Sequence, residues 1–227
     1  MCFQNQFFNI LLIKMNYKII KDELQHIISG TSGFSYDASI QAITSFLRTS
    51  EKTSQTIKGK HQNKEKETAN LIDFANKNGI WYNDINPNNY ISEGAEQKVF
   101  MKDPQTVVKL NDAIYYASWE DYFHNLLLHN YFFADTAYRF LGFYLQNNIL
   151  YAAVAQNYVY SDSQTTLEHV RIFLESNGFI NKKNHDYYHP ELGIILEDLH
   201  DENVLTNKSV LYFIDTVFFI KSEVFWS

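Results

Sequence analysis

Cysteine, net positive charge and long hydrophobic runs are all scarce in this chain, and each scarcity excludes a class of protein. Cys2 is the only cysteine, so no intramolecular disulfide, thiolate metal cluster or redox pair can form. This fits a reducing, cytoplasmic compartment. The formal net charge is −7, with acidic residues spread along the chain, which argues against coating of phosphate backbones. Nucleic acid is therefore not an expected partner.

The apolar run near the N-terminus, from Phe7 to Ile13, is too short to span a membrane. It also lacks a basic leader and a small-residue cleavage site, so we expect neither an export signal nor a membrane partner. Met15 follows the run and is an alternative start site. Hydrophobic residues make up 45% of the chain, which is enough for a packed globular core.

The first third of the chain predicts helices separated by breakers and a linker. Apolar spacing predicts helices over 17–28 and 36–47, with the Ser29–Gly33 stretch between them. The polar, lysine-rich segment 49–68 has the composition of a linker. We therefore place a boundary there, with residues 1–62 forming a helical arm and linker and residues 63–227 forming the main domain. A further helix is expected to end at Asn78, before Gly79.

From residue 89 onward the pattern changes to short β-favouring runs interrupted by helices. The expected strands and helices follow in chain order: strands 90–92, 97–102 and 106–110, a helix over 118–132, strands 138–145 and 149–155, a helix over 166–176, and a strand-rich end over 194–219. Gly94 lies in the first turn, and Asn147 in a polar turn of hairpin character. This order predicts an α+β fold with antiparallel strands.

The segment that carries the most chemical information runs from Gly193 to Asp215. It is expected to pair two strands around acidic residues, with Asp198 and Asn203 flanking a turn and Asp215 ending the last strand. A phosphoryl-transfer site needs a carboxylate near the attacking hydroxyl and separate oxygen ligands for Mg²⁺. Asp198, Asn203 and Asp215 can supply both the carboxylate and the oxygen ligands. Asp and Asn also favour hairpin ends whatever the function, so ordinary turn residues are the alternative.

The order and spacing of these three residues resemble the catalytic loop and metal-binding aspartate of protein kinases and aminoglycoside phosphotransferases. The resemblance implies that Asp198 orients or deprotonates the acceptor hydroxyl, and that Asn203 and Asp215 bind Mg²⁺. His200, inside the same turn, either orients Asp198, contacts phosphate or merely stabilises the turn.

Upstream segments match the same families in the expected order. Gly94 begins a segment that resembles a reduced glycine loop, and the Thr106–Lys109 run resembles the strand whose lysine grips the ATP phosphates. Within the helix expected over 118–132, the resemblance implies Glu120 as the partner of Lys109, with Asp121 as a rival. Its hinge, where the backbone binds adenine, would lie near Gln156.

More narrowly, the strings GAEQKVF, VVKL, AQNYV, EDLHDENVL and YFID resemble the kinase-like domains of polyvalent proteins in bacterial mobile elements, over about residues 70–220. This implies a two-lobed, protein-kinase-like fold with a β-sheet N-lobe over 63–156 and a reduced C-lobe over 157–227. It also implies ATP and Mg²⁺ as cofactors and a hydroxyl acceptor, the Ser, Thr or Tyr of a protein.

The sequence departs from ordinary protein kinases at several points. Leu196-Glu197 stands where a His-Arg pair precedes the catalytic Asp, and Thr216-Val217 follows Asp215 in place of Phe-Gly. The glycine loop has a single glycine, and residues 216–227 leave no room for an activation segment. Two alternatives therefore stay open: a pseudokinase or protein-interaction module without transfer activity, and a small-molecule kinase.

Overall fold

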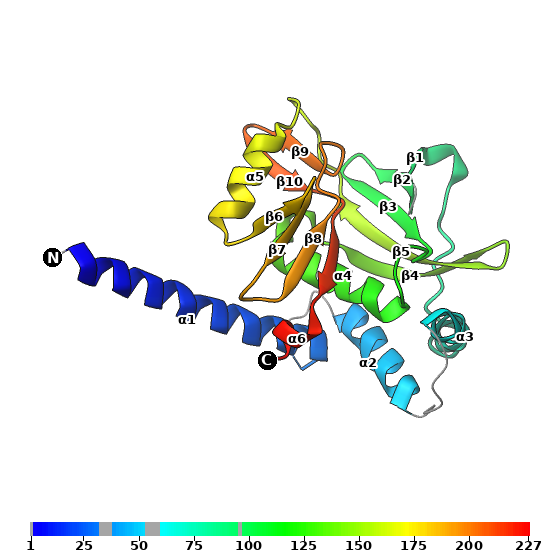
Figure 1. Cartoon of the computed structure of the whole chain (residues 1–227). Coiled ribbons are helices and arrows are strands. Elements are labelled where there is room, and N and C mark those ends of the chain that lie inside the picture. Colours follow the sequence, from blue (N-terminus) through cyan, green and yellow to red (C-terminus); the bar gives the residue numbers. More distant parts are fainter. Residues whose placement is uncertain (1, 32–37, 53–59, 95–96) are drawn as a thin grey trace.

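The computed structural model describes residues 2–31, 38–52, 60–94 and 97–227, and shows an α+β fold with antiparallel sheets (Figure 1). Its main helices are α1 (Cys2–Ser29), α2 (Ala38–Lys52), α3 (Lys60–Asn78), α4 (Trp119–Phe132), α5 (Leu167–Ser176) and α6 (Ser222–Phe225). Its strands are β1 (Tyr90–Glu93), β2 (Gln97–Asp103), β3 (Thr106–Asn111), β4 (Arg139–Gln146), β5 (Ile149–Asn157), β6 (Ile180–Lys183), β7 (Asp186–His189), β8 (Ile194–Glu197), β9 (Val204–Asn207), β10 (Val210–Phe213) and β11 (Val217–Ile220). Among the described helices, none combines the length and apolar character needed to cross a membrane.

The first sheet confirms the strands expected between residues 90 and 157. Its order is β1-β2-β3-β5-β4, with every neighbouring pair antiparallel. The turn between β4 and β5 places Asn147 and Asn148 at φ values of 52° and 63°, as a tight hairpin turn requires. Helix α4 begins where expected, because the Ser118 hydroxyl accepts a hydrogen bond from the Asp121 N–H at 3.0 Å.

The second sheet, β11-β8-β7-β6, corrects the expectation for the chemical segment. Strand β8 pairs with β11 and β7, whereas β9 pairs with β10 in a separate hairpin. The turn that begins at Asp198 therefore connects two sheets, and the expected pairing of strands around it is wrong. The β6–β7 hairpin was missed because residues 180–183 are all solvent-exposed and mostly polar, so they show no apolar alternation.

The helices expected in the first part of the chain are found, and they are longer than expected. Helix α1 extends back to Cys2, and part of the expected 36–47 helix, residues 36–37, lies outside the described residues. The expected linker over 49–68 is largely wrong, because α2 continues to Lys52 and α3 begins at Lys60, with 53–59 outside the described residues. Lysine and glutamate favour solvent-exposed helices as well as linkers, so composition did not separate the two.

One hydrophobic core joins the arm to the sheets. Buried side chains of α1 and α2, such as Leu24, Ile28 and Ile43, belong to the same cluster as Trp119 and Phe123 of α4. The second sheet packs on α4 too, where the rings of Phe132 and Phe218 stack 5.5 Å apart. Helix α4 is therefore the centre of the molecule, with the arm and both sheets around it (Figure 1). The boundary at residue 62 stays a prediction, although the arm and the main domain share this core.

Arg48 of α2 fastens the arm to α4. Its guanidinium donates to the backbone oxygens of Ile28 and Ser29, at 2.7 and 3.2 Å, at the end of α1. It also donates to Glu120 Oε1 at 3.3 Å, in the first turn of α4. One side chain thus satisfies two of the carbonyls that a helix end leaves without partners, and pairs with the next helix.

A glycine in β4 admits a close backbone approach from the segment after α3. Gly142 lies at a bulge with φ of 145°, and a Cβ there would lie 2.8 Å from the Ile80 carbonyl oxygen and 3.0 Å from the Tyr82 nitrogen. Both atoms are hydrogen-bonded to Phe143, so the segment cannot retreat without breaking these bonds. Only glycine fits this position.

Replacing Gly142 with alanine is therefore expected to lower the free energy of unfolding by roughly 2–4 kcal/mol, through strained backbone and overpacking. Urea denaturation monitored by tryptophan fluorescence measures this. Gly79→Ala is the matched control, since Gly79 also has positive φ, 65°, but nothing within 4 Å of a built Cβ. It should cost about 1 kcal/mol. Equal losses for the two variants would contradict the close approach.

A double-mutant cycle of Arg48→Ala and Glu120→Ala should give a coupling free energy of roughly 0.5–1 kcal/mol, as for a partly exposed ion pair. Arg48→Ala alone should cost more, because it also leaves two helix-end carbonyls without their donor. The comparison cycle joins Lys109→Met with Glu120→Ala, and we expect no measurable coupling there. Coupling in the second cycle and none in the first would contradict the pairing described above.

Candidate active site

The turn between β8 and β9 holds Asp198 and Asn203 together. Asp198 adopts φ of 63°, which turns the chain away from β8 and leaves its side chain 56% exposed. The Asn203 side-chain amide donates to the Asp198 backbone oxygen at 2.8 Å and to its Oδ2 at 2.9 Å. These bonds orient the Asp198 carboxylate, as an acid–base group at a reaction centre requires.

His200 lies inside this turn and contacts both residues. Its Nε2 is 3.5 Å from Asp198 Oδ1 and 3.1 Å from Asn203 Nδ2. Its Nδ1 is 3.3 Å from the Glu202 N–H, which donates to it. His200 therefore braces the turn, and it also lines the pocket next to Asp198.

Backbone hydrogen bonds place Asp215 beside Asn203. The N–H groups of Ile214 and Asp215 both donate to the Asn203 carbonyl oxygen, at 2.9 and 3.3 Å. Because β9 and β10 form a tight hairpin, the residues before and after it return to the same point. The hairpin thus converts a twelve-residue separation in sequence into direct contact.

Lys109 of β3 reaches the same point from the first sheet. Its ammonium donates to the Ile214 carbonyl oxygen at 2.8 Å and lies 3.8 Å from Asp215 Oδ2. Burial lowers the pKa of Lys109, and the Asp215 carboxylate opposes that shift. Burial also raises the pKa of Asp215, opposed by Lys109. Each charge thus compensates for the lost solvation of the other.

A second group of buried side chains holds the Ile214–Thr216 segment against α4 and the first sheet. The Tyr138 hydroxyl donates to the Ile214 oxygen at 2.9 Å, and its ring lies 5.5 Å from the Lys109 ammonium. His129 Nδ1 lies 2.7 Å from the Thr216 hydroxyl, and burial lowers the pKa of His129 to about 3, so the ring is neutral. Sequence reasoning missed both roles, since these contacts span 76 and 87 residues.

Asp198, Asn203 and Asp215 open onto one pocket of about 730 Å³ between the first sheet and the second. Side chains from both sheets line it: Gly94, Gln97, Tyr115, Tyr116, Asp186, Glu197, Asp198, His200, Glu202, Asn203, Asp215, Val217 and Phe219. Lys109 lies behind Asp215 and does not line the pocket. The structure thus brings four of the predicted residues, Gly94 included, to one cavity, and it places Lys109 directly behind one of them, Asp215.

Gly94 occupies the turn between β1 and β2, where its N–H donates to the Gln97 oxygen at 2.9 Å. The rest of the expected glycine loop, residues 95–96, lies outside the described residues. Gln97, at the start of β2, donates its side-chain amide to Asp215 Oδ2. Sequence reasoning missed Gln97, because nothing in the local pattern separates it from any polar residue at a strand end.

Gln156 lies in β5, opposite Val107 of β3, and its side chain is buried. The amide donates to the Thr136 oxygen at 2.7 Å, so it points into the protein rather than into the pocket. A hinge role therefore depends on backbone groups near Gln156, as the resemblance implied. This role stays a prediction.

Glu120 does not pair with Lys109, which corrects the expectation drawn from the resemblance. Glu120 is engaged by Arg48 and lies 3.6 Å from His124, while Lys109 faces Asp215. Asp121, the rival, donates its backbone N–H to the hydroxyl of Ser118, the residue that caps the start of α4. The arm supplies the arginine that holds Glu120, and a partner so distant in sequence was not foreseeable from helix spacing.

The oxygen groups at this site fit Mg²⁺, which prefers carboxylate and carbonyl ligands together with substrate phosphates. Asp215 and Asn203, whose side chains carry such oxygens, both line the pocket. Across the part of the chain that the structure describes, no three His, Cys, Asp or Glu side chains form a metal-binding group. An ion here would therefore need ligands from a bound substrate as well.

One comparison with known proteins finds a family. A family model described as "Serine/Threonine/Tyrosine Kinase found in polyvalent proteins" matches residues 64–222, the stretch that contains every residue of the pocket. No curated protein and no solved structure matches the chain. The matched stretch covers well over half of the sequence, and the chain belongs to this family of kinases found in polyvalent proteins.

Proposed function

We propose that the chain transfers the γ-phosphoryl group of ATP to a hydroxyl group of a protein, with Mg²⁺ bound at Asn203 and Asp215. The observation that carries this proposal is the convergence of Asp198, Asn203 and Asp215 on one pocket, with the buried Lys109 ammonium behind it. Family membership supports a phosphotransferase as the class of enzyme.

The pocket also supports a two-lobed arrangement, in which the first sheet and α4 form one lobe and residues after 157 form a smaller one. Gly94 and Gln97 reach the pocket from the first sheet, and Asp198, Asn203 and Asp215 reach it from the other side. A nucleotide bound between them would have its phosphates near Gly94 and Asp215. Positioning of this kind supplies much of the rate of phosphoryl transfer.

In the proposed reaction, the acceptor oxygen attacks the γ-phosphorus and the bond to the β,γ-bridging oxygen breaks, so ADP leaves with the bonding electron pair. Asp198 orients the acceptor hydroxyl and takes its proton. Asn203 holds Asp198 in place, and Lys109 fixes Asp215 and supplies positive charge behind it. Mg²⁺ would neutralise charge on the phosphate oxygens when bound.

A second candidate, nucleotide binding without transfer, is favoured by one observation. Asp215 Oδ2 already accepts a hydrogen bond from Gln97 and faces Lys109, so these groups compete with a metal ion for the same oxygen. This candidate shares the nucleotide site and differs only in the chemical step.

The nucleotide site is tested with Asp215→Asn, measured by thermal unfolding with ATP, with and without Mg²⁺. Ligand that binds only the native state raises its stability, so the wild type should show a Mg²⁺-dependent increase in Tm and the variant should not. Asp201→Asn, in the same turn but outside the pocket lining, should keep the increase. No Mg²⁺-dependent increase in the wild type would overturn the proposed function.

The chemical step is tested with Asp198→Asn, measured by transfer of labelled phosphate from ATP to mixed protein acceptors. We expect Mg²⁺-dependent stabilisation by ATP to be retained and the transfer rate to fall about 10²–10⁴-fold, the usual contribution of a positioned base. Asp201→Asn again serves as the control and should transfer at the wild-type rate. Equal transfer by wild type and Asp198→Asn would exclude this mechanism, and stabilisation without any transfer would favour the second candidate.

A further inference from the structure

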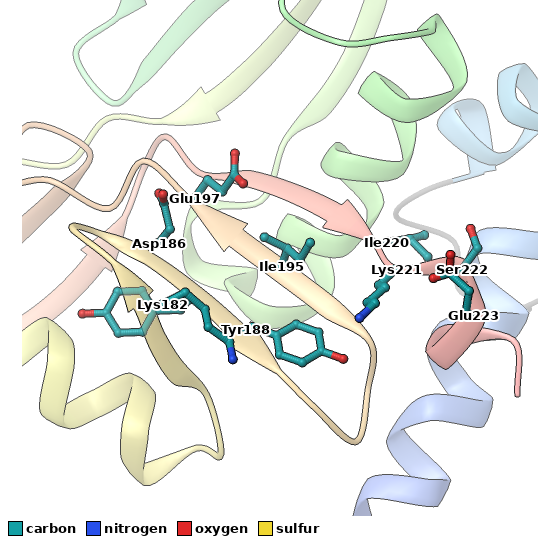
Figure 2. Close-up of a pocket in the computed structure, with 10 residues that line it drawn as sticks. Lys182, Asp186, Tyr188, Ile195, Glu197, Ile220, Lys221, Ser222 and Glu223 are labelled. Atoms are coloured by element: carbon teal, nitrogen blue, oxygen red, sulfur yellow. The ribbon is translucent and has the colours of Figure 1, made fainter.

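The second sheet presents one of its faces away from the core. Strands β7 and β8 alternate regularly: Tyr187 and Leu196 are buried, whereas Tyr188 and Ile195 are only partly buried. Figure 2 shows this outer face, with α4 behind the strands. A groove of about 660 Å³ runs over it, lined by Lys182, Asp186, Tyr187, Tyr188, Ile195, Glu197, Ile220, Lys221, Ser222 and Glu223.

Two lysines flank Tyr188 at one end of this groove (Figure 2). The ammonium groups of Lys182 and Lys221 lie 5.4 and 5.5 Å from the centre of the Tyr188 ring. Lys182 is the extra residue of a β-bulge between Asn181 and Lys183, a feature that re-aims a side chain. Neither ammonium forms an ion pair with any carboxylate of the described residues, Glu223 of the groove included.

The other end of the groove meets the candidate active site. Asp186 and Glu197 line both the groove and the pocket that holds Asp198. The Asp198 N–H donates to Asp186 Oδ1 at 3.4 Å, and Glu197 directly precedes Asp198 in the chain. A segment lying in the groove would therefore reach Asp198 without leaving the surface.

The strand register sets the distance between the two ends. Tyr188 is paired with Ile195 of β8, which lies three residues before Asp198 in the chain. At about 3.3 Å per residue, this pair lies roughly 10 Å from Asp198 along the chain, and the two ammonium groups lie beside the Tyr188 ring. An extended peptide with a hydroxyl at Asp198 would span the same distance with about three residues.

The sequence of charges along the groove selects among possible occupants. Lys182 and Lys221 attract a negative group, whereas Asp186 and Glu197 repel one closer to Asp198. A uniformly anionic polymer would be attracted by the lysines but repelled by the two carboxylates. A segment with a single acidic side chain at one end would place that side chain at the lysines only. Tyr188 and Ile195 offer apolar surface beside the two lysines, as a peptide side chain requires.

We propose that this groove binds the protein acceptor as an extended segment, with an acidic side chain about three residues from the acceptor hydroxyl held between Lys182 and Lys221. Positions next to the hydroxyl then face Asp186 and Glu197, which select neutral or basic side chains there. The inference rests on the proposed function, since it names the class of acceptor for the same site.

The test measures peptide binding by fluorescence anisotropy on the full chain, so it does not depend on transfer. Labelled peptides carry one Ser, Thr or Tyr at the centre and alanine elsewhere, with Glu or Lys three residues away on both sides. We expect the wild type to bind a Glu peptide at least tenfold more tightly than its Lys counterpart. Lys182→Glu combined with Lys221→Glu should abolish or reverse this preference.

The matched control combines Lys183→Glu with Lys208→Glu, two exposed lysines that do not line the groove, and it should keep the preference. Equal binding of Glu and Lys peptides by the wild type would contradict the proposal that this groove binds the acceptor. An unchanged preference in the Lys182→Glu, Lys221→Glu variant would contradict it too. Stabilisation by Mg²⁺ and ATP is measured on the same variants and should be unaffected. Its loss in the wild type would instead overturn the proposed function, so the two failures are distinguishable.

Discussion

The buried Lys109 ammonium is the interaction on which the geometry of the site depends. It joins the first sheet to the chain segment that carries Asp215, through one carbonyl and one carboxylate, and Gln97 of the same sheet adds a second contact with Asp215. Placing an ammonium in the interior is costly unless it is paired and hydrogen-bonded, and both conditions are met here. The cost of separating the two charges therefore keeps the two sides of the pocket in a fixed relation. A carboxylate held in this way needs little reorganisation to meet a positive ion.

Much of the fold was predictable because the local signals were strong. The strands of the first sheet and the start of α4 follow from alternation, turn residues and a serine cap, and the structure reproduces them to within a few residues. The β6–β7 hairpin was not predictable, since its first strand is fully exposed and has no apolar face. The lysine-rich segment before residue 68 was misinterpreted because its residues are equally compatible with an exposed helix.

The candidate site likewise contains some residues that the sequence could predict and others that it could not. Asp198, Asn203 and Asp215 were identified from spacing, and the β9–β10 hairpin explains why that spacing works: it returns the chain to its starting point. Gln97, Tyr138 and His129 carry no such signal, because their contacts with the Ile214–Thr216 segment join residues 76 to 118 positions apart. The wrong partner for Glu120 has a similar origin. Its arginine comes from a helix before the stretch that matches the family.

Arg48 is one of several residues outside the family match that belong to the same folded unit. The stretch that matches the family is therefore shorter than the part of the chain that folds together. The match spans residues 64–222, yet the core around α4 also contains Leu24, Ile40 and Leu47 from before it and Phe225 from after it. A protein cut to the matched limits would expose the apolar side of α4 that the first two helices cover. Such surface favours aggregation. Expression and crystallisation should therefore keep the arm, even though the catalytic chemistry is proposed to lie wholly within the matched stretch.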